Sequence, residues 1–348
     1  MIRRESSPIP QAIGITAEPT KARPAQHYAW LLLWALIPLA LWWSLREVSF
    51  PAILDTLSSL RLGSILVLAV LNVLIFLLFS SRWWLILRTQ GYSQPYLALS
   101  GYRLAAFGVT YFTPGTQLGG EPLQVYLLQR RGGIPTATAV ASVALEKLLE
   151  LVANFTFLLV GVTTILATGI LGDRLSIGLL LLPIGLLVLP VGYLVPLWRG
   201  AHPISWVVER LARRFPGSIR LNQASQTASA AEREVARFCR EHPRTLLLAS
   251  SFSLVIWVLK VFEFGLTLQF LGLPLALPEV ITALTAARLA YLMPFPAGLG
   301  SLEASQVLAM GLIGVTPAAG IALSLVIRAR DVLLGVSGLW LGGVLARR

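Results

Sequence analysis

Apolar runs that approach or exceed the length needed to cross a lipid bilayer recur along most of this 348-residue chain. A membrane-spanning helix needs roughly 20 apolar residues. The candidate spans are Tyr28 to Leu45, Leu62 to Ser81, Pro135 to Thr168, Leu175 to Trp198, Leu246 to Leu271 and the segment from Pro317 onward. Only 13% of the residues are charged, which is about half the share typical of soluble domains. The sequence therefore predicts an all-α polytopic membrane protein with about six full transmembrane helices.

Basic residues are unevenly distributed between the segments that connect these runs. Cytoplasmic loops of membrane proteins collect Lys and Arg, and with the N-terminus inside, 19 basic residues lie on the cytoplasmic side and three outside. We therefore expect a multi-pass protein of the cell (inner) membrane with both termini cytoplasmic. Residues 1–27 are expected to form a disordered tail, 28–348 a single transmembrane domain, and 199–244 a basic cytoplasmic loop. That loop is interpreted as a solvated stretch, with binding of anionic lipid or a partner as the second interpretation.

Two further segments are interrupted by proline and glycine. Thr113 to Glu121 reads TPGTQLGGE, and Phe295 to Glu303 reads FPAGLGSLE. Proline removes a backbone donor and glycine relaxes the backbone, so neither segment should be a continuous helix. Each follows an apolar stretch that is short for a crossing. We expect two re-entrant hairpins, although eight full spans would place the termini on the same sides.

The two interrupted segments belong to a repeat at one offset. Glu121 and Glu303 are 182 residues apart, and the same offset relates Pro114 to Pro296 and Pro135 to Pro317. We interpret this as repeat halves of about 61–168 and 245–346. Because the second and sixth spans would run in opposite directions, the repeats would be inverted, an architecture that recurs in transporters.

Charged groups within the apolar segments are the candidate binding residues, because each is costly near the bilayer centre unless it is paired or hydrated. Glu146 and Glu150 lie four residues apart and should repel unless a cation lies between them. The offset proposes Arg328 as the partner of Glu146. Local pairing of Lys260 with Glu263, and of Arg328 with Asp331, is also expected.

These groups have two interpretations. They could form neutral networks that fix helix packing, or a polar cavity that receives a charged headgroup, with proton coupling left open. For a phosphate, Arg103, Arg288 and Arg328 are favoured because guanidinium groups match phosphate oxygens. Backbone donors at the helix starts beside Gly119 and Gly300 would add to an anion site.

Signals for catalysis are weak. The three histidines lie in polar segments, and the single cysteine, Cys239, excludes a disulfide within the chain and a cysteine-based metal cluster. We predict no metal, no cofactor and no nucleic-acid partner. Catalysis by carboxylates alone stays open.

The combined motifs resemble a known family. The sequence PG…GGE…YLL around Glu121, the EK…E of Glu146 to Glu150, and PAGLG…E followed by Arg328 are similar to the lysylphosphatidylglycerol synthase transmembrane (flippase-like) family. The resemblance implies an inner-membrane protein that moves lipids or lipid-linked groups. The aminoacyl-transferase domain found in the synthases does not follow here, so lysyl transfer is not expected. It also implies roles for Gln117 and Tyr126.

The sequence hypothesis is a lipid or lipid-headgroup translocase. The alternatives are a membrane-embedded transferase or hydrolase, and a non-transporting scaffold for a lipid-modifying enzyme. Expected partners are membrane lipids with anionic or lipid-linked phosphate headgroups, and a homo-oligomer is left open. The candidate substrate-binding residues are Arg103, Gln117, Glu121, Tyr126, Glu146, Glu150, Lys260, Glu263, Arg288, Glu303, Arg328 and Asp331.

Overall fold

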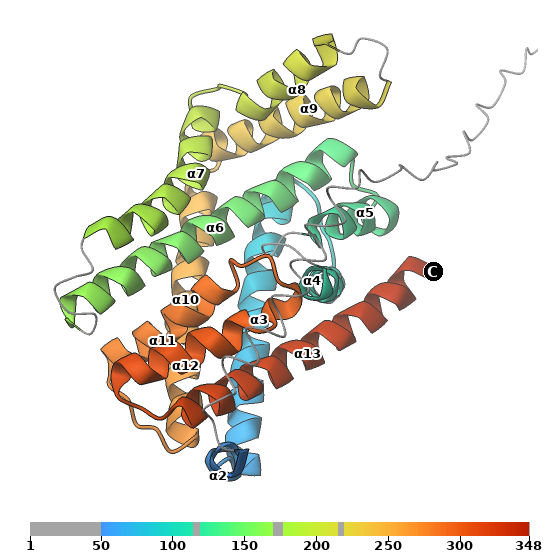
Figure 1. Ribbon diagram of the computed structural model, residues 1–348. Helices are drawn as coiled ribbons and strands as arrows, with labels where there is room; N and C mark the ends of the chain where they lie inside the picture. Colours follow the sequence, from blue (N-terminus) through green and yellow to red (C-terminus); the bar gives the residue numbers. More distant parts are fainter. Residues whose placement is uncertain (1–49, 114–118, 170–176, 215–218, 348) are drawn as a thin grey trace, which may run out of the picture.

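The structure is a computed structural model that describes residues 50–113, 119–169, 177–214 and 219–347. Within these residues the regular elements are all helices (Figure 1). The predicted tail over 1–27, the predicted span from Tyr28 and the candidate residue Gln117 lie outside the described residues. The predicted all-α architecture is confirmed.

Four described segments are long and apolar enough to cross a membrane: α3 (Leu62–Thr89), α6 (Thr136–Ala167), Gly178–Trp198 and α10 (Pro243–Phe270). The third consists of α7 (Leu181–Trp198) and the end of η1 (Ile177–Leu180). A short helix, α2 (Phe50–Ser58), precedes α3, and α13 (Pro317–Arg347) ends the chain. Helix α3 does not stop at Arg82, as the sequence suggested, but continues for two further turns with that side chain buried.

The two interrupted segments separate pairs of short helices. Helix α4 (Tyr96–Phe112) is followed by α5 (Glu121–Gly132), and α11 (Leu277–Ala290) is followed by η2 (Pro296–Gly298) and α12 (Ser301–Ile313). In the second break Ala297 has φ 53°, a left-handed conformation that is rare for a residue with a Cβ. Gly298 and Gly300 also have positive φ, 62° and 77°. Helix α4 therefore ends before the first interrupted segment and α5 begins at its end, and the second segment interrupts the helix between α11 and α12 as expected.

The order long, short, short, long occurs twice. Helices α3, α4, α5 and α6 begin at residues 62, 96, 121 and 136, and α10, α11, α12 and α13 begin at 243, 277, 301 and 317. The starting positions are thus separated by 180 or 181 residues. Helices α3 and α10 pack side by side and antiparallel (Figure 1), because Ser59 contacts Phe270 whereas Arg82 contacts Ser253.

Helices α4 and α13 cross with their backbones nearly in contact. A Cβ built at Gly338 would lie 2.1 Å from the carbonyl oxygen of Leu104, and one at Gly108 would lie 2.6 Å from that of Gly335. Only a hydrogen atom fits at such positions, which is why small residues are enriched where membrane helices pack closely. Glycine therefore permits this crossing between the two halves of the molecule.

The segment 199–244 is more ordered than a solvated loop. It forms α8 (Pro203–Arg214) and α9 (Ile219–Glu241), which lie together at one end of the molecule (Figure 1). Phe238 and Cys239 of α9 are buried in a core that includes residues of α6 and α7. The buried carboxylate of Glu232 accepts hydrogen bonds from the first backbone amides of α8 and from Tyr193. An amphipathic pattern and one buried acid together explain this helical hairpin.

Candidate functional site

A cavity of about 260 Å³ opens among α3, α4, α5, α6, α10, α11 and α13. Both helix breaks contribute to its wall, through Thr113 and Gly120 on one side and Phe295 to Gly298 on the other. Ten charged side chains line it: Arg103, Glu121, Glu146, Lys147, Glu150, Lys260, Glu263, Arg288, Arg330 and Asp331. Apolar side chains such as Phe76, Phe79 and Leu284 line the rest of the wall, so the cavity can contact both a charged group and apolar atoms.

Glu146 is the centre of the most buried ion pair. Its Oε1 atom contacts Nη2 of Arg82 and lies 2.7 Å from Nη1 of Arg103. The Arg82 guanidinium also donates a 2.7 Å hydrogen bond to the hydroxyl of Ser253. Arg82 and Glu146 are only 1% and 4% exposed at their side chains. The ion pair between Arg82 and Glu146 therefore links α3 to α6 at the cavity wall.

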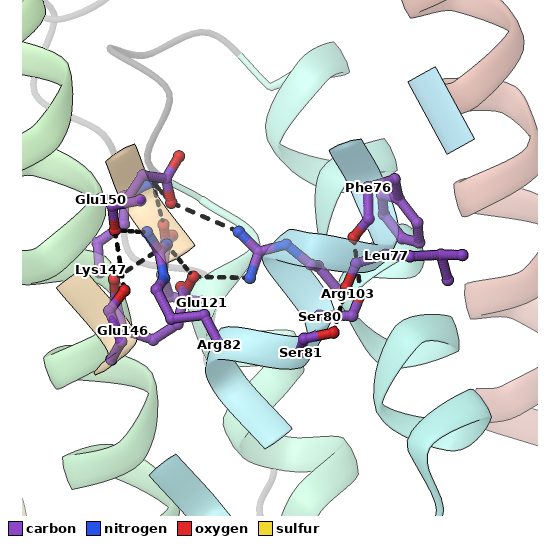
Figure 2. Close-up of polar contacts among 12 residues, drawn as sticks. Phe76, Leu77, Ser80, Ser81, Arg82, Arg103, Glu121, Glu146, Lys147 and Glu150 are labelled. Carbon is purple, nitrogen blue, oxygen red and sulfur yellow. Dashed lines mark hydrogen bonds and ion pairs between the residues drawn. The ribbon is translucent and has the colours of Figure 1, made fainter. Parts of the chain in front are cut away.

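Lys147 and Glu150 continue this network towards the open part of the cavity. Nζ of Lys147 lies 3.1 Å from Glu121 and 3.6 Å from Glu150, and Arg103 lies 3.7 Å from Glu150. Figure 2 shows these alternating charges on neighbouring helices. Arg103 thus lies between the two carboxylates that the sequence expected to repel each other. The network joins α3, α4, α5 and α6.

Glu121 and Glu303 occupy matching places at the two breaks. One carboxylate oxygen of Glu121 accepts a 2.8 Å hydrogen bond from the Gly119 amide, and one of Glu303 accepts a 3.0 Å bond from the Gly300 amide. The other oxygen faces a cation on the following long helix, Lys147 or Arg328. The amides of Gly119 and Gly300 therefore already have acidic partners. The expectation that these two amides add to an anion site stays a prediction, and a ligand anion there would have to replace a carboxylate.

Arg328 does not pair with Glu146, contrary to the sequence expectation. It binds Glu303 and donates to the carbonyl oxygen of Ala297 at 3.2 Å, so it holds the second break in place. The two expected local pairs are also absent among the described contacts. Glu263 lies 3.4 Å from Arg330, and Asp331 lies 2.8 Å from the same guanidinium.

Lys260 and Arg288 differ from the other cavity bases. Neither forms an ion pair with any described residue, and both instead lie over the ring of Trp257, at 4.7 and 5.2 Å from its centroid. Lys260 also lies 4.6 Å from the ring centre of Phe79. The buried Nε atom of Arg288 has no hydrogen-bond partner.

The structure brings together most of the residues that the sequence singled out. Eight line the cavity: Arg103, Glu121, Glu146, Glu150, Lys260, Glu263, Arg288 and Asp331. Glu303 and Arg328 support the second break, whereas Tyr126 is 43% exposed and absent from the cavity wall. Sequence reasoning omitted Arg82, Lys147 and Arg330 from the site. Their position within apolar stretches was the available signal for the last two, and Arg82 was mistaken for a loop residue.

Among the described residues, no set of three His, Cys, Asp or Glu side chains is close enough to hold a metal ion. The acids of the cavity are instead matched with Arg or Lys. The arrangement can bind and orient a charged group by ion pairing.

Comparison with known proteins agrees with this architecture. An archaeal "UPF0104 membrane protein" from Methanothermobacter thermautotrophicus is 23% identical over 274 residues, which cover 76% of this chain and 80% of the relative. Residues 30–338 match the family described as "Lysylphosphatidylglycerol synthase TM region". The chain is therefore a multi-pass membrane protein that belongs to the lysylphosphatidylglycerol synthase transmembrane-region family.

Proposed function

We propose that the protein is a translocase that moves a lipid, or a lipid-linked group, between the leaflets of the membrane. The observation that carries this proposal is the charged cavity enclosed by apolar helices. Charges at membrane depth are rare and typically mark substrate pathways. The cavity would accept the headgroup while the acyl chains remain in the bilayer, and the membrane lipids themselves would be the ligands.

The helix pattern supports a transporter architecture for this proposal. At 17 and 12 residues, α4 and α5 are shorter than ordinary spans, as are α11 and α12 at 14 and 13. Two re-entrant hairpins within inverted repeats would account for these lengths, for the recurring helix starts and for the antiparallel α3 and α10. Backbone breaks at membrane depth require protein or a wet cavity around them, and both breaks line this cavity. We place both termini in the cytoplasm of an inner-membrane protein.

A lipid-scrambling assay in proteoliposomes tests the proposal. Labelled anionic phospholipids and polyprenyl phosphates are reconstituted with the wild type, with Glu150→Gln and with Glu209→Gln. Glu150 lines the cavity and is 30% exposed at its side chain, whereas Glu209 lies on α8 outside it. We expect protein-dependent movement that Glu150→Gln reduces and Glu209→Gln leaves unchanged.

Two results would contradict the proposal, the first by excluding translocation and the second by excluding the cavity as its route. One is that wild-type protein moves none of the labelled lipids above the rate of empty vesicles. The other is that both variants move lipid as fast as the wild type, which would separate the activity from the cavity. Mass spectrometry of the same vesicles would reveal chemical change of the headgroup, and such turnover without movement would favour the enzyme alternative.

A further inference from the structure

We propose that Lys260 and Arg288 form an anion subsite that binds a phosphate-type oxyanion. This inference rests on the proposed function, because it names the chemistry that one wall of the same cavity would recognise. The oxyanion could belong to a lipid headgroup or to free phosphate, and both present the same oxygens to the two cations.

Lys260 and Arg288 are the cavity cations that have no carboxylate partner among the described residues. Five basic and five acidic side chains line the cavity, and the buried Arg82 beside it is a sixth base. All five acids are within 4.0 Å of Arg or Lys. Among the described bases of the cavity, only Lys260 and Arg288 lack such a carboxylate. The unliganded site therefore has an excess of positive charge at one place.

The side chains of Lys260 and Arg288 both lie against the ring of Trp257. Phe157 stacks on this ring at a centroid distance of 4.2 Å and an interplanar angle of 12°, so it covers one face. Lys260 and Arg288 lie 4.7 and 5.2 Å from the centroid of the same ring. The two cations come from different helices, α10 and α11, and both line the cavity and a smaller pocket beside it that also includes Trp257 and Glu150.

The residue types favour an oxyanion with several oxygens. Cation–π contact offsets part of the desolvation of an ammonium or guanidinium group, typically by about 0.5–2 kcal/mol, but it supplies no hydrogen-bond acceptor. The Nε of Arg288 is buried without an acceptor. Phosphate oxygens match the fork of a guanidinium and can accept from an ammonium at the same time. A bound phosphate would thus supply the counter-charge that neither Arg288 nor Lys260 has among the described residues.

The test measures phosphate and lipid binding to the purified full chain. Native mass spectrometry and competition binding in detergent compare the wild type with Lys260→Gln and Arg288→Gln, using a short-chain phosphatidylglycerol as probe. Arg210→Gln, which removes an exposed cation on α8, is the matched control. We expect each cavity variant to bind the probe roughly 10- to 100-fold more weakly, since charged hydrogen bonds contribute that much, and the control to bind as the wild type.

A conservative variant separates binding from folding. Arg288→Lys keeps the charge and loses the fork, so it should restore part of the affinity, whereas a general loss of fold would not be rescued in this way. Lys260→Gln and Arg288→Gln should remain monodisperse and folded, because neither residue has an ionic partner to lose and the lost cation–π contacts contribute only about 0.5–2 kcal/mol.

Competitors identify the source of the oxyanion. Displacement of the probe by inorganic phosphate assigns the subsite to the oxyanion itself, and displacement only by phospholipids assigns it to the lipid headgroup. Probe binding that is unchanged in both cavity variants overturns the subsite, even if the vesicle assay shows translocation. Weakened binding in both variants, with no lipid movement by the wild type, leaves the subsite standing and refutes translocation alone.

Discussion

Replacement of Glu146 by Gln tests how the buried network holds the cavity together. In the wild type this carboxylate lies between Arg82 and Arg103. Arg103 retains an alternative acid, Glu150, at 3.7 Å. Arg82 retains the Ser253 hydroxyl, a long contact to the backbone oxygen of residue 146 and the ring of Phe79, none of which is charged. The substitution would therefore leave one guanidinium, 1% exposed at its side chain, without a counter-charge.

The expected magnitude follows from this burial. Removal of one partner of a buried ion pair typically destabilises a protein by about 3–5 kcal/mol, because the remaining charge stays desolvated. By contrast, Glu150→Gln removes a carboxylate that is 30% exposed and 3.6 Å from its nearest base. Pairs of that kind contribute about 0–1 kcal/mol. Two substitutions of the same chemistry, one helical turn apart, should thus differ severalfold in effect.

The assay measures the free energy of reversible unfolding of each variant in mild detergent. Chromatographic monodispersity and the melting temperature are measured on the same samples. A double variant, Arg82→Gln with Glu146→Gln, completes a thermodynamic cycle and should be more stable than Glu146→Gln alone, because it no longer contains the unpaired charge. Equal stability of Glu146→Gln and Glu150→Gln would refute the reasoning. So would a double variant whose loss is the sum of the two single losses.

Three further predictions concern other parts of the fold. Gly338→Ala should destabilise the protein by about 1–3 kcal/mol through the clash with Leu104, whereas Gly343→Ala, on the same helix in open space, should not; equal melting temperatures would contradict the close crossing. Burial alone would raise the pKa of Glu232, but hydrogen bonds from Ser205, Tyr193 and the Ile204 amide outweigh it and lower the pKa. The stabilisation by Glu232 is therefore complete above the ordinary pKa of glutamate and is lost as pH falls through the lowered pKa of the folded protein. Hydrogen exchange of the backbone amides at the start of α8 should accelerate only in that acidic range. A constant exchange rate would contradict the role of Glu232 in holding α8. Burial raises the pKa of Cys239 to about 11, so alkylation at neutral pH should be slow until denaturant is added, and rapid labelling of the native protein would show that α9 is not packed as described.

The sequence predicted the helix breaks well because proline and glycine act locally. The end of α4 at Phe112 and the start of α5 at Glu121 follow from residue chemistry alone. The candidate charges were likewise identifiable, because a charge within an apolar run is conspicuous. The pairing of those charges was less accessible, since it depends on the rotation of each helix about its axis.

One residue explains the main error in pairing. The offset of 182 relates Glu121 to Glu303 and Pro135 to Pro317, but Pro135 precedes α6 whereas Pro317 is the first residue of α13, so the two helices begin 181 residues apart. A shift of one residue rotates a helical position by about 100°. Arg328 is therefore the counterpart of Lys147, not of Glu146, and each of these two bases faces the carboxylate of its own break. An ungapped comparison of the two halves could not reveal a register change between break and helix.

The crossing of α4 and α13 links the two breaks mechanically. Because the glycine contacts at Gly108 and Gly338 leave no room for a Cβ between the backbones, we expect a displacement of one helix at this crossing to move the other. Arg328 lies on α13 about 15 Å along the axis from that crossing, by the helical rise, and it holds the second break through Glu303. We therefore expect a displacement that starts at the first break to reach the second through α13, as movement of Arg328 and its partner Glu303. This coupling would depend on two residues, Gly108 and Gly338, that contribute no side chain to the cavity.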